Sequence, residues 1–251
     1  MNSFDRVSIS GSVEAKAGGL GACEGMAGGR VHLRAAATIG VFGSYRVAQV
    51  LTRRLVVAAI VSIPFAAHGQ DGPIGPIRSL NDALLALMQK GAQVPFAQRM
   101  QTLTPIVQRA FDLPQILRNS VGLRWNGIPA AQQEELLNAF IQFTVASYVA
   151  NFDNYSNERF EIDPRTRAIR SEQVVQTRIV PTTGDPTRID YVMHLAEGGV
   201  WKAVDVLLDG SISRVAVQRS DFRSLLASGD PARLIDSLRE KIARYAAGGK
   251  Y

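Results

Sequence analysis

The chain contains a single cysteine, Cys23, so no disulfide can form within one molecule. Histidine is also scarce: there are three, and only His194 lies beyond residue 69. The glycine-rich loops that bind nucleotide phosphates and the Gly-x-Ser-x-Gly turn of many hydrolases are both absent. One histidine without cysteine cannot form a zinc site unless carboxylates cluster beside it, and the acidic residues are scattered. We therefore predict no metal site, no cofactor and no catalytic residue.

The sequence has little excess charge once its first part is set aside. The whole chain carries 28 basic and 22 acidic side chains, a formal net charge of +6. Residues 70–251 carry 21 basic and 19 acidic side chains, a net charge of +2. The positive charge therefore belongs largely to the segment before residue 70, and a nucleic-acid partner is not indicated.

The sequence also lacks a long hydrophobic run. The apolar stretch Leu55–Ala67 has 13 residues, whereas a membrane-spanning helix needs roughly 20. Two arginines precede the stretch, and Ala67 and Gly69 form the small-x-small pattern that signal peptidase requires. We predict that residues 46–69 are a cleavable signal peptide and that the mature protein is located in the periplasm of a Gram-negative bacterium.

The segment before this signal is expected to be separate from the folded protein. Residues 1–45 are rich in Gly and Ala and show no periodicity, so we predict a non-native or disordered N-terminal extension. Residues 70–251 are predicted to form a single lipid-binding domain. Roughly 180 residues can bury an adequate core without disulfides.

Apolar residues recur every three to four positions in the first half of this domain, which is typical of helices. Ser79 can cap the first helix, Pro105 interrupts the second, and the fourth is apolar over more than one face. The expected helices are Ser79–Gly91, Pro95–Phe111, Leu113–Gly122 and Pro129–Phe152, with two more at the C-terminal end, Asp221–Gly229 and Asp230–Tyr245.

From Asn157 the period changes to two, and the short connections require antiparallel neighbours. The expected strands are Glu158–Asp163, Glu172–Val180, Thr187–Glu197, Val200–Asp209 and Ser211–Ser220. One face should carry Val175, Thr177, Ile179, Ile189, Tyr191, Met193 and Leu195, and the other Arg178, Arg188, Asp190 and His194. We predict an α+β fold: N-terminal helices, a curved antiparallel β-meander of four to five strands, and C-terminal helices enclosing an apolar cavity.

Two polar residues of the predicted sheet allow alternative interpretations. Asp205 lies inside an apolar strand, where it faces solvent, pairs across the sheet with an arginine such as Arg178 or Arg188, or acts as an acid or base that lines a cavity. His194 is either a surface or packing residue or a catalytic one. Apolar ligands are bound by sites lined mainly with aromatic and aliphatic side chains, so the pattern favours binding over catalysis.

Two stretches of the chain resemble the MlaC family, also called toluene-tolerance auxiliary proteins. The first, "WKAVDVLLDGSISRVAVQRSDFRSLL", matches the family pattern at Trp201, Lys202, Asp205, Val206, Gly210, Arg219, Ser220 and Phe222. The second, "LRWNGIPAAQQEELLNAFIQFTVASY", matches at Trp125, Pro129, Gln132 and Gln133, and one strand also matches at Asp190, Tyr191 and His194. The order of elements, the predicted signal and the absence of cysteine after residue 69 agree with the family.

The resemblance implies a soluble periplasmic shuttle that holds acyl chains inside the protein. It would carry lipid between an outer-membrane lipoprotein component and an inner-membrane ABC transporter with an MCE-domain subunit. The residues expected to bind lipid are Phe140, Phe143, Tyr148, Val175, Ile179, Tyr191, Met193, Trp201 and Leu207. The residues expected to be structural are Asp205, Gly210, Arg219 and Phe222.

The sequence departs from the family pattern at two places. Ala203 stands where the family often has Tyr, and Val217-Gln218-Arg219 replaces an Asn-Tyr-Arg pattern. These departures resemble the branch associated with hopanoid-biosynthesis operons, so the expected ligand is a phospholipid or a hopanoid. Two other functions stay open: a small periplasmic enzyme that uses Asp205 or His194 on an apolar substrate, and a structural adaptor with a solid core.

Overall fold

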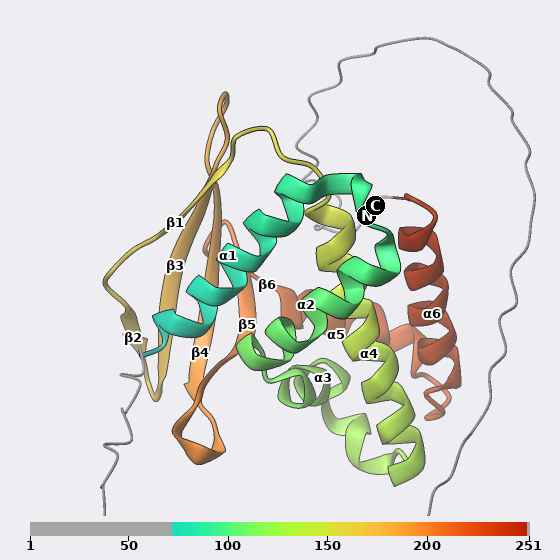
Figure 1. The fold of residues 1–251 in the computed structure, drawn as a ribbon. Helices are drawn as coiled ribbons and strands as arrows, with labels where there is room; N and C mark the ends of the chain where they lie inside the picture. Colours follow the sequence, from blue (N-terminus) through green and yellow to red (C-terminus); the bar gives the residue numbers. More distant parts are fainter. Residues whose placement is uncertain (1–71, 250–251) are drawn as a thin grey trace, which may run out of the picture. The chain divides into compact units, whose positions relative to one another are not determined.

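The computed structural model describes residues 72–249, which contain six α-helices and six β-strands. The predicted signal peptide and N-terminal extension lie outside the described residues. The helices pack against one side of an antiparallel sheet, so the predicted α+β class is confirmed (Figure 1). The long helices are α1 (Ile74–Lys90), α2 (Phe96–Ala110), α3 (Leu113–Val121), α4 (Ala130–Asn151), α5 (Arg214–Leu225) and α6 (Ala232–Ala246).

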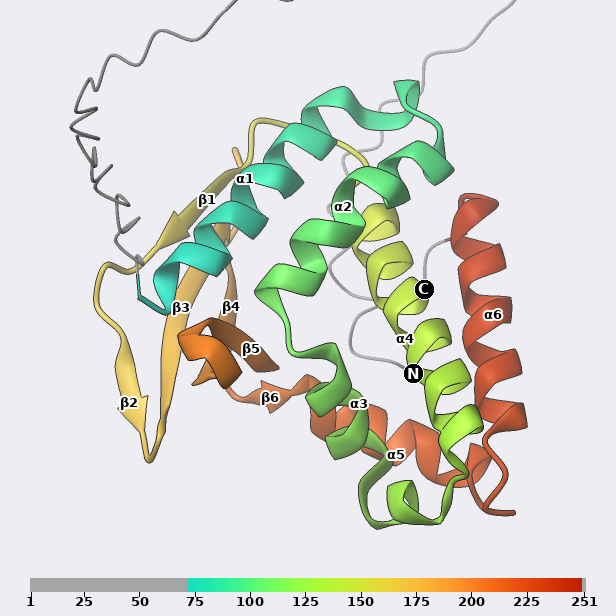
Figure 2. The ribbon, with the colours of Figure 1, turned by 60° about the horizontal axis from the view of Figure 1, so that its bottom comes forward.

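Short helical turns connect some of these elements. Among them, η1 (Gly91–Gln93) joins α1 to α2, and η2 (Gly122–Gly127) joins α3 to α4. Helices α1 and α2 are neighbours, as are α4 and α6, and α5 lies beside α3 (Figure 2). Helix α4 is buried continuously from Val145 to Ala150 because helices cover it on more than one side, as its apolar pattern predicted.

The sheet has the strand order β1-β3-β4-β5-β6, and every pairing is antiparallel. Its strands are β1 (Arg159–Ile162), β2 (Arg167–Ile169), β3 (Glu172–Val180), β4 (Thr187–Leu195), β5 (Trp201–Leu208) and β6 (Ile212–Ser213). Strand β2 pairs with β3 beside β1, and η3 (Glu197–Gly199) turns the chain from β4 to β5. The described residues contain one strand more than the predicted four to five, because the three-residue strand β2 was not predicted.

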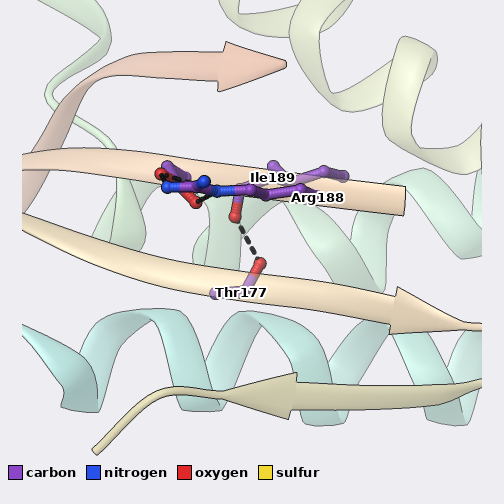
Figure 3. A network of polar contacts seen from close by, with 4 residues as sticks. Thr177, Arg188 and Ile189 are labelled. Carbon is purple, nitrogen blue, oxygen red and sulfur yellow. Dashed lines mark hydrogen bonds and ion pairs between the residues drawn. The ribbon is translucent and has the colours of Figure 1, made fainter. Parts of the chain in front are cut away.

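The helix-facing side of the sheet carries the residues that the alternation predicted. Val175 and Ile179 on β3 and Ile189, Tyr191 and Met193 on β4 belong to the main core. Thr177 lies on the same side, and its buried hydroxyl donates a hydrogen bond to the carbonyl of Ile189 at 2.6 Å (Figure 3). Leu195 was expected on this face but is 55 % exposed, since it lies at the end of β4.

The prediction of a strand over Ser211–Ser220 was wrong. Only Ile212 and Ser213 pair with β5, and the chain then enters α5. Ser213 caps this helix by accepting a hydrogen bond from the Ala216 amide at 3.0 Å. Valines at alternate positions imitate a strand here, but Gln218 and Phe222, four residues apart, are the positions that α5 buries.

Two details of the first helices also differ from prediction. Helix α1 begins at Ile74 rather than at a Ser79 cap, because buried Ile77 extends the apolar stripe upstream. Helix α2 continues through Pro105, since burial of Leu103 and Val107 on either side holds the turn that the proline weakens. None of the helices within residues 72–249 has the length and apolar character that a membrane crossing requires.

Candidate functional site

A cavity of about 50 Å³ lies among α3, α4, β5 and α5. Most of its lining is apolar, and its polar groups include the guanidinium of Arg214 and the carboxylate of Asp205. The lining residues are Phe111, Leu113, Ile116, Phe140, Phe143, Thr144, Ser147, Tyr148, Asp205, Val206, Arg214, Val215 and Gln218. Such a surface suits an apolar group with a polar end.

Three of the predicted lipid-binding residues line this cavity: Phe140, Phe143 and Tyr148, all on α4. They share one side of the helix with Thr144 and Ser147, because the five positions follow the spacing i, i+3, i+4, i+7 and i+8. Each is also part of an aromatic contact network. The ring of Phe140 meets Phe222 edge to face with centroids 6.4 Å apart, and Tyr148 stacks on Phe152 at 5.9 Å.

The predicted lipid-binding residues of the sheet lie elsewhere. Val175, Ile179 and Met193 are buried in the main core and do not line the cavity. Trp201 is half-buried and packs against the same core. Leu207 lies in a separate small cluster with Val174, Val192 and Val204.

The separation of Leu207 from the main core follows from an irregularity in β5. The register between β4 and β5 shifts at Val192/Met193, so that Val192 pairs with Asp205 and Met193 with Ala203. Before the shift, the odd-numbered residue Ala203 faces the core. After it, the even-numbered residues Val206 and Leu208 do so. A β-bulge of this kind reverses the side to which later residues point.

Asp205 joins β5 to the start of α5, and the predicted pairing with Arg178 or Arg188 is wrong. One carboxylate oxygen accepts hydrogen bonds from the amides of Val206 at 2.8 Å and Val215 at 3.0 Å. The other accepts from the Ser213 hydroxyl at 2.5 Å. Arg188 instead pairs with the buried carboxylate of Asp190 at 2.6 Å. Asp205 therefore positions one wall of the cavity.

The other residues predicted to be structural each have a defined contact. Gly210 adopts φ +73°, and a Cβ there would lie 2.7 Å from the Arg188 guanidinium carbon, so a side chain is excluded. The guanidinium of Arg219 donates to the carbonyl of Asn119 at 3.0 and 2.6 Å, joining α5 to the end of α3. Phe222 is buried between the two halves of the core.

Sequence reasoning missed the part of the lining that α3 and α5 contribute. Ile116 comes from α3, and Arg214, Val215 and Gln218 come from α5. Gln218 is buried, and its amide oxygen accepts a hydrogen bond from the Ser120 hydroxyl at 3.0 Å. The helical spacing of Val215, Gln218 and Phe222 was the available signal, but the alternating valines concealed it.

Two buried tyrosines, Tyr148 and Tyr191, lie close enough together beside the cavity for each to affect the pKa of the other. Burial raises the pKa of Tyr148 well above the ordinary value of about 10, and the charge of an ionised Tyr191 would raise it further. Burial likewise raises the pKa of Tyr191. Both phenols are therefore neutral in the folded protein near neutral pH.

We expect the protein to lose stability as the pH rises above about 10. An unfolded tyrosine ionises near pH 10, whereas these two stay protonated in the fold, so their stabilising effect is complete below that pH and disappears above it. Each contributes a slope of at most about 1.4 kcal/mol per pH unit. Denaturant unfolding measured against pH should show a shallower decline for Tyr191→Phe than for the native sequence. Ionisation of both phenols near pH 10 in the folded protein would contradict this expectation.

His194 lies outside the cavity. Its Nε2 is 2.9 Å from a carboxylate oxygen of Asp112, at the start of α3. Neither residue is among those that line the cavity, although Phe111 and Leu113 on either side of Asp112 are. The pair therefore connects β4 to the junction of α2 and α3.

An antiparallel sheet with helices on one side and an apolar-lined cavity among β5, α3, α4 and α5 defines an α+β protein of helix-on-sheet architecture. A family model described as "MlaC protein" matches residues 78–240, and the chain therefore belongs to the MlaC family. The search of curated proteins found no match.

Among solved structures, the chain is similar to the phospholipid-binding protein from Ralstonia solanacearum, determined in complex with a phospholipid. The TM-score is 0.60 and the identity 18 %, over 69 % of this chain and 98 % of that one. The likeness confirms the fold.

Proposed function

We propose that this protein binds a phospholipid through its acyl chains and has no catalytic role. The observation that carries the proposal is the apolar cavity between α4 and the pair α3 and α5, in a chain of the MlaC family. The binding of a phospholipid by the Ralstonia solanacearum protein, which shares the fold, supports it. Removing acyl chains from water is worth about 0.8 kcal/mol for each CH₂ group.

The cavity must enlarge to accept an acyl chain. Its volume of about 50 Å³ is far below the roughly 300–1,000 Å³ of ordinary ligand pockets. Residues of α3 and α5 face Phe140 and Phe143 of α4 across the cavity. Because Arg219 and Gln218 tie α5 to α3, we propose that these two helices move together away from α4.

Membership of the MlaC family supports a wider role in lipid transport as a proposal. We propose that the protein is located in the periplasm and shuttles lipid between an outer-membrane lipoprotein component and an inner-membrane ABC transporter with an MCE-domain subunit. Because Ala203 and Val217 depart from the common family pattern, we propose a hopanoid as a second ligand. Membership of the family supports these proposals, and each partner can be tested by pull-down with the purified component.

Thr144→Arg is expected to abolish lipid binding while the protein stays folded. Thr144 lines the cavity and is half-buried, so the new guanidinium can reach water while its stem occupies the cavity. Protein expressed from the full sequence would be purified, and its lipid content measured by native mass spectrometry and solvent extraction. We expect lipid in the native protein and a reduction of tenfold or more in the variant.

The matched control is Asn138→Arg, which adds the same side chain to an exposed position of α4. It should retain both lipid and thermal stability. If the native protein carried no lipid, or if Thr144→Arg carried the native amount, lipid binding in this cavity would be refuted. A turnover product released from a bound lipid would favour the enzyme interpretation instead.

A further inference from the structure

A leucine at the turn between α3 and α4 is almost completely exposed. Leu123 in η2 has a relative exposure of 99 %, and the other large apolar residues that are exposed within residues 72–249 reach at most 55 %. Single exposed apolar side chains are common on protein surfaces, so exposure alone assigns no role. The geometry and the charge around Leu123 are what distinguish it.

The turn that carries Leu123 is held in place from two sides. The side-chain amide of Gln133 donates to the carbonyl of Trp125 at 3.1 Å and to that of Ile128 at 2.8 Å. On the other side, Arg219 binds the carbonyl of Asn119 at the end of α3. The leucine is therefore presented by a fixed turn, which forgoes the stabilisation that its burial would provide.

Three arginines surround the turn. The guanidinium of Arg118 lies over the ring of Trp125, 5.9 Å from the centroid, and Arg124 is exposed. The Arg219 side chain lies beside the start of the turn, 3.6 Å from where a Cβ of Gly122 would be. Residues 113–133 contain two arginines and no Asp or Glu. The first acidic residues on the C-terminal side are Glu134 and Glu135, and Glu135 pairs with Arg239 at 2.8 Å.

We infer that η2 docks on the surface of an anionic phospholipid bilayer, with Leu123 inserted at the acyl-chain boundary and the arginines beside the phosphates. A bilayer interface presents negative charge above an apolar layer, and this turn presents an apolar group among positive charges. The half-buried Trp125 at the base of the turn suits the interfacial layer as well.

The turn lies next to the helices that line the cavity, so docking would bring the cavity close to the bilayer from which lipid is taken. This link to lipid exchange rests on the proposed function. Helix α3 leads into η2 and lines the cavity with Ile116, and α5 lies beside α3 and lines it with Val215. Figure 2 shows the turn between α3 and α4 at the lower edge of the view, close to α5. Docking through η2 would hold α3 and α5 next to the membrane, and these are the two helices that must move to open the cavity.

The experiment is flotation of the protein, expressed from its full sequence, with vesicles of equal parts phosphatidylglycerol and phosphatidylethanolamine. We expect Leu123→Ser to weaken vesicle binding about tenfold. The double variant Arg118→Gln/Arg124→Gln should weaken it about 30-fold at low salt. Vesicles of phosphatidylcholine alone should bind the native protein weakly, and added salt should reduce binding to the anionic vesicles.

Two matched controls separate the turn from general effects of polarity and charge. Leu195→Ser changes a leucine that is 55 % exposed, in a segment, residues 195–201, that carries Glu197 and no basic residue. Arg165→Gln/Arg167→Gln removes two exposed positive charges near the other edge of the sheet. Both controls should bind the anionic vesicles as the native protein does.

Failure of the native protein to bind these vesicles, or equal binding by the η2 variants, would overturn the inference. A second result would also overturn it: that the η2 variants lose, to the same extent as vesicle binding, the capture of a purified partner protein in detergent. The turn would then bind a protein pocket rather than a bilayer. Lipid extracted from the same samples tests the proposed function separately. Protein that binds vesicles through η2 but contains no lipid would contradict the proposed lipid binding and would still support the docking surface.

Discussion

Met193→Arg is expected to unfold the protein. The Met193 side chain on β4 is fully buried in the core between sheet and helices and does not line the cavity. An arginine there would place a charge in an apolar environment with no route to water, at a cost of several kcal/mol. That cost is comparable with the whole stability of an ordinary domain, about 5–15 kcal/mol.

Circular dichroism and a thermal melt would test this expectation. The variant should lack a cooperative transition, whereas Met193→Leu, which conserves volume, should lose less than about 1.5 kcal/mol. Thr144→Arg provides the contrast, because the same side chain is tolerated where the cavity gives it access to water. A folded Met193→Arg protein that lacked lipid would instead return Met193 to the lipid-binding residues that the sequence pattern predicted.

Asp205→Ala is expected to lower the free energy of unfolding by about 2–4 kcal/mol. The carboxylate accepts three hydrogen bonds, each contributing about 1 kcal/mol, and its loss leaves the amides of Val206 and Val215 without their acceptor. The first turn of α5 would lose its connection to β5, and with it the position of one wall of the cavity.

Asp205→Asn is the informative comparison. Both amides donate to the same oxygen, Oδ1, which asparagine retains, and the Ser213 hydroxyl can rotate to accept from the new amide. We expect this variant to lose less than half as much stability as Asp205→Ala in urea unfolding. Equal losses would show that the negative charge, rather than the hydrogen-bond geometry, holds α5 in place.

The order of the elements could be predicted because apolar residues change their period near Asn157, from helical spacing to alternation. Both long strands β3 and β4 were predicted with their core faces, since Val175 and Tyr191 alternate regularly with polar neighbours. The first half of α5 was missed, and the helix was predicted to begin only at Asp221, because Val215 and Val217 alternate as they would in a strand. Its capping by Ser213 and Asp205 depends on a contact between β5 and the chain ten residues later.

The candidate site was predicted in part for the same reason. Phe140, Phe143 and Tyr148 were named from the apolar pattern of one long helix, and they line the cavity. The other wall depends on α3 and α5, whose approach to each other is set by contacts of Arg219 and Gln218 with residues about a hundred positions away. Local periodicity carries no information about such contacts.

The sequence alone determined the α+β class, the helix and strand content of most segments, and the family to which the chain belongs, because these depend on local patterns of apolar residues and turns. Only the tertiary structure decided which apolar residues border a cavity and which fill the core. Strand β5 is apolar on both sides, so its register shift at Val192/Met193, and not its composition, places Val206 beside the cavity and Leu207 on the opposite face.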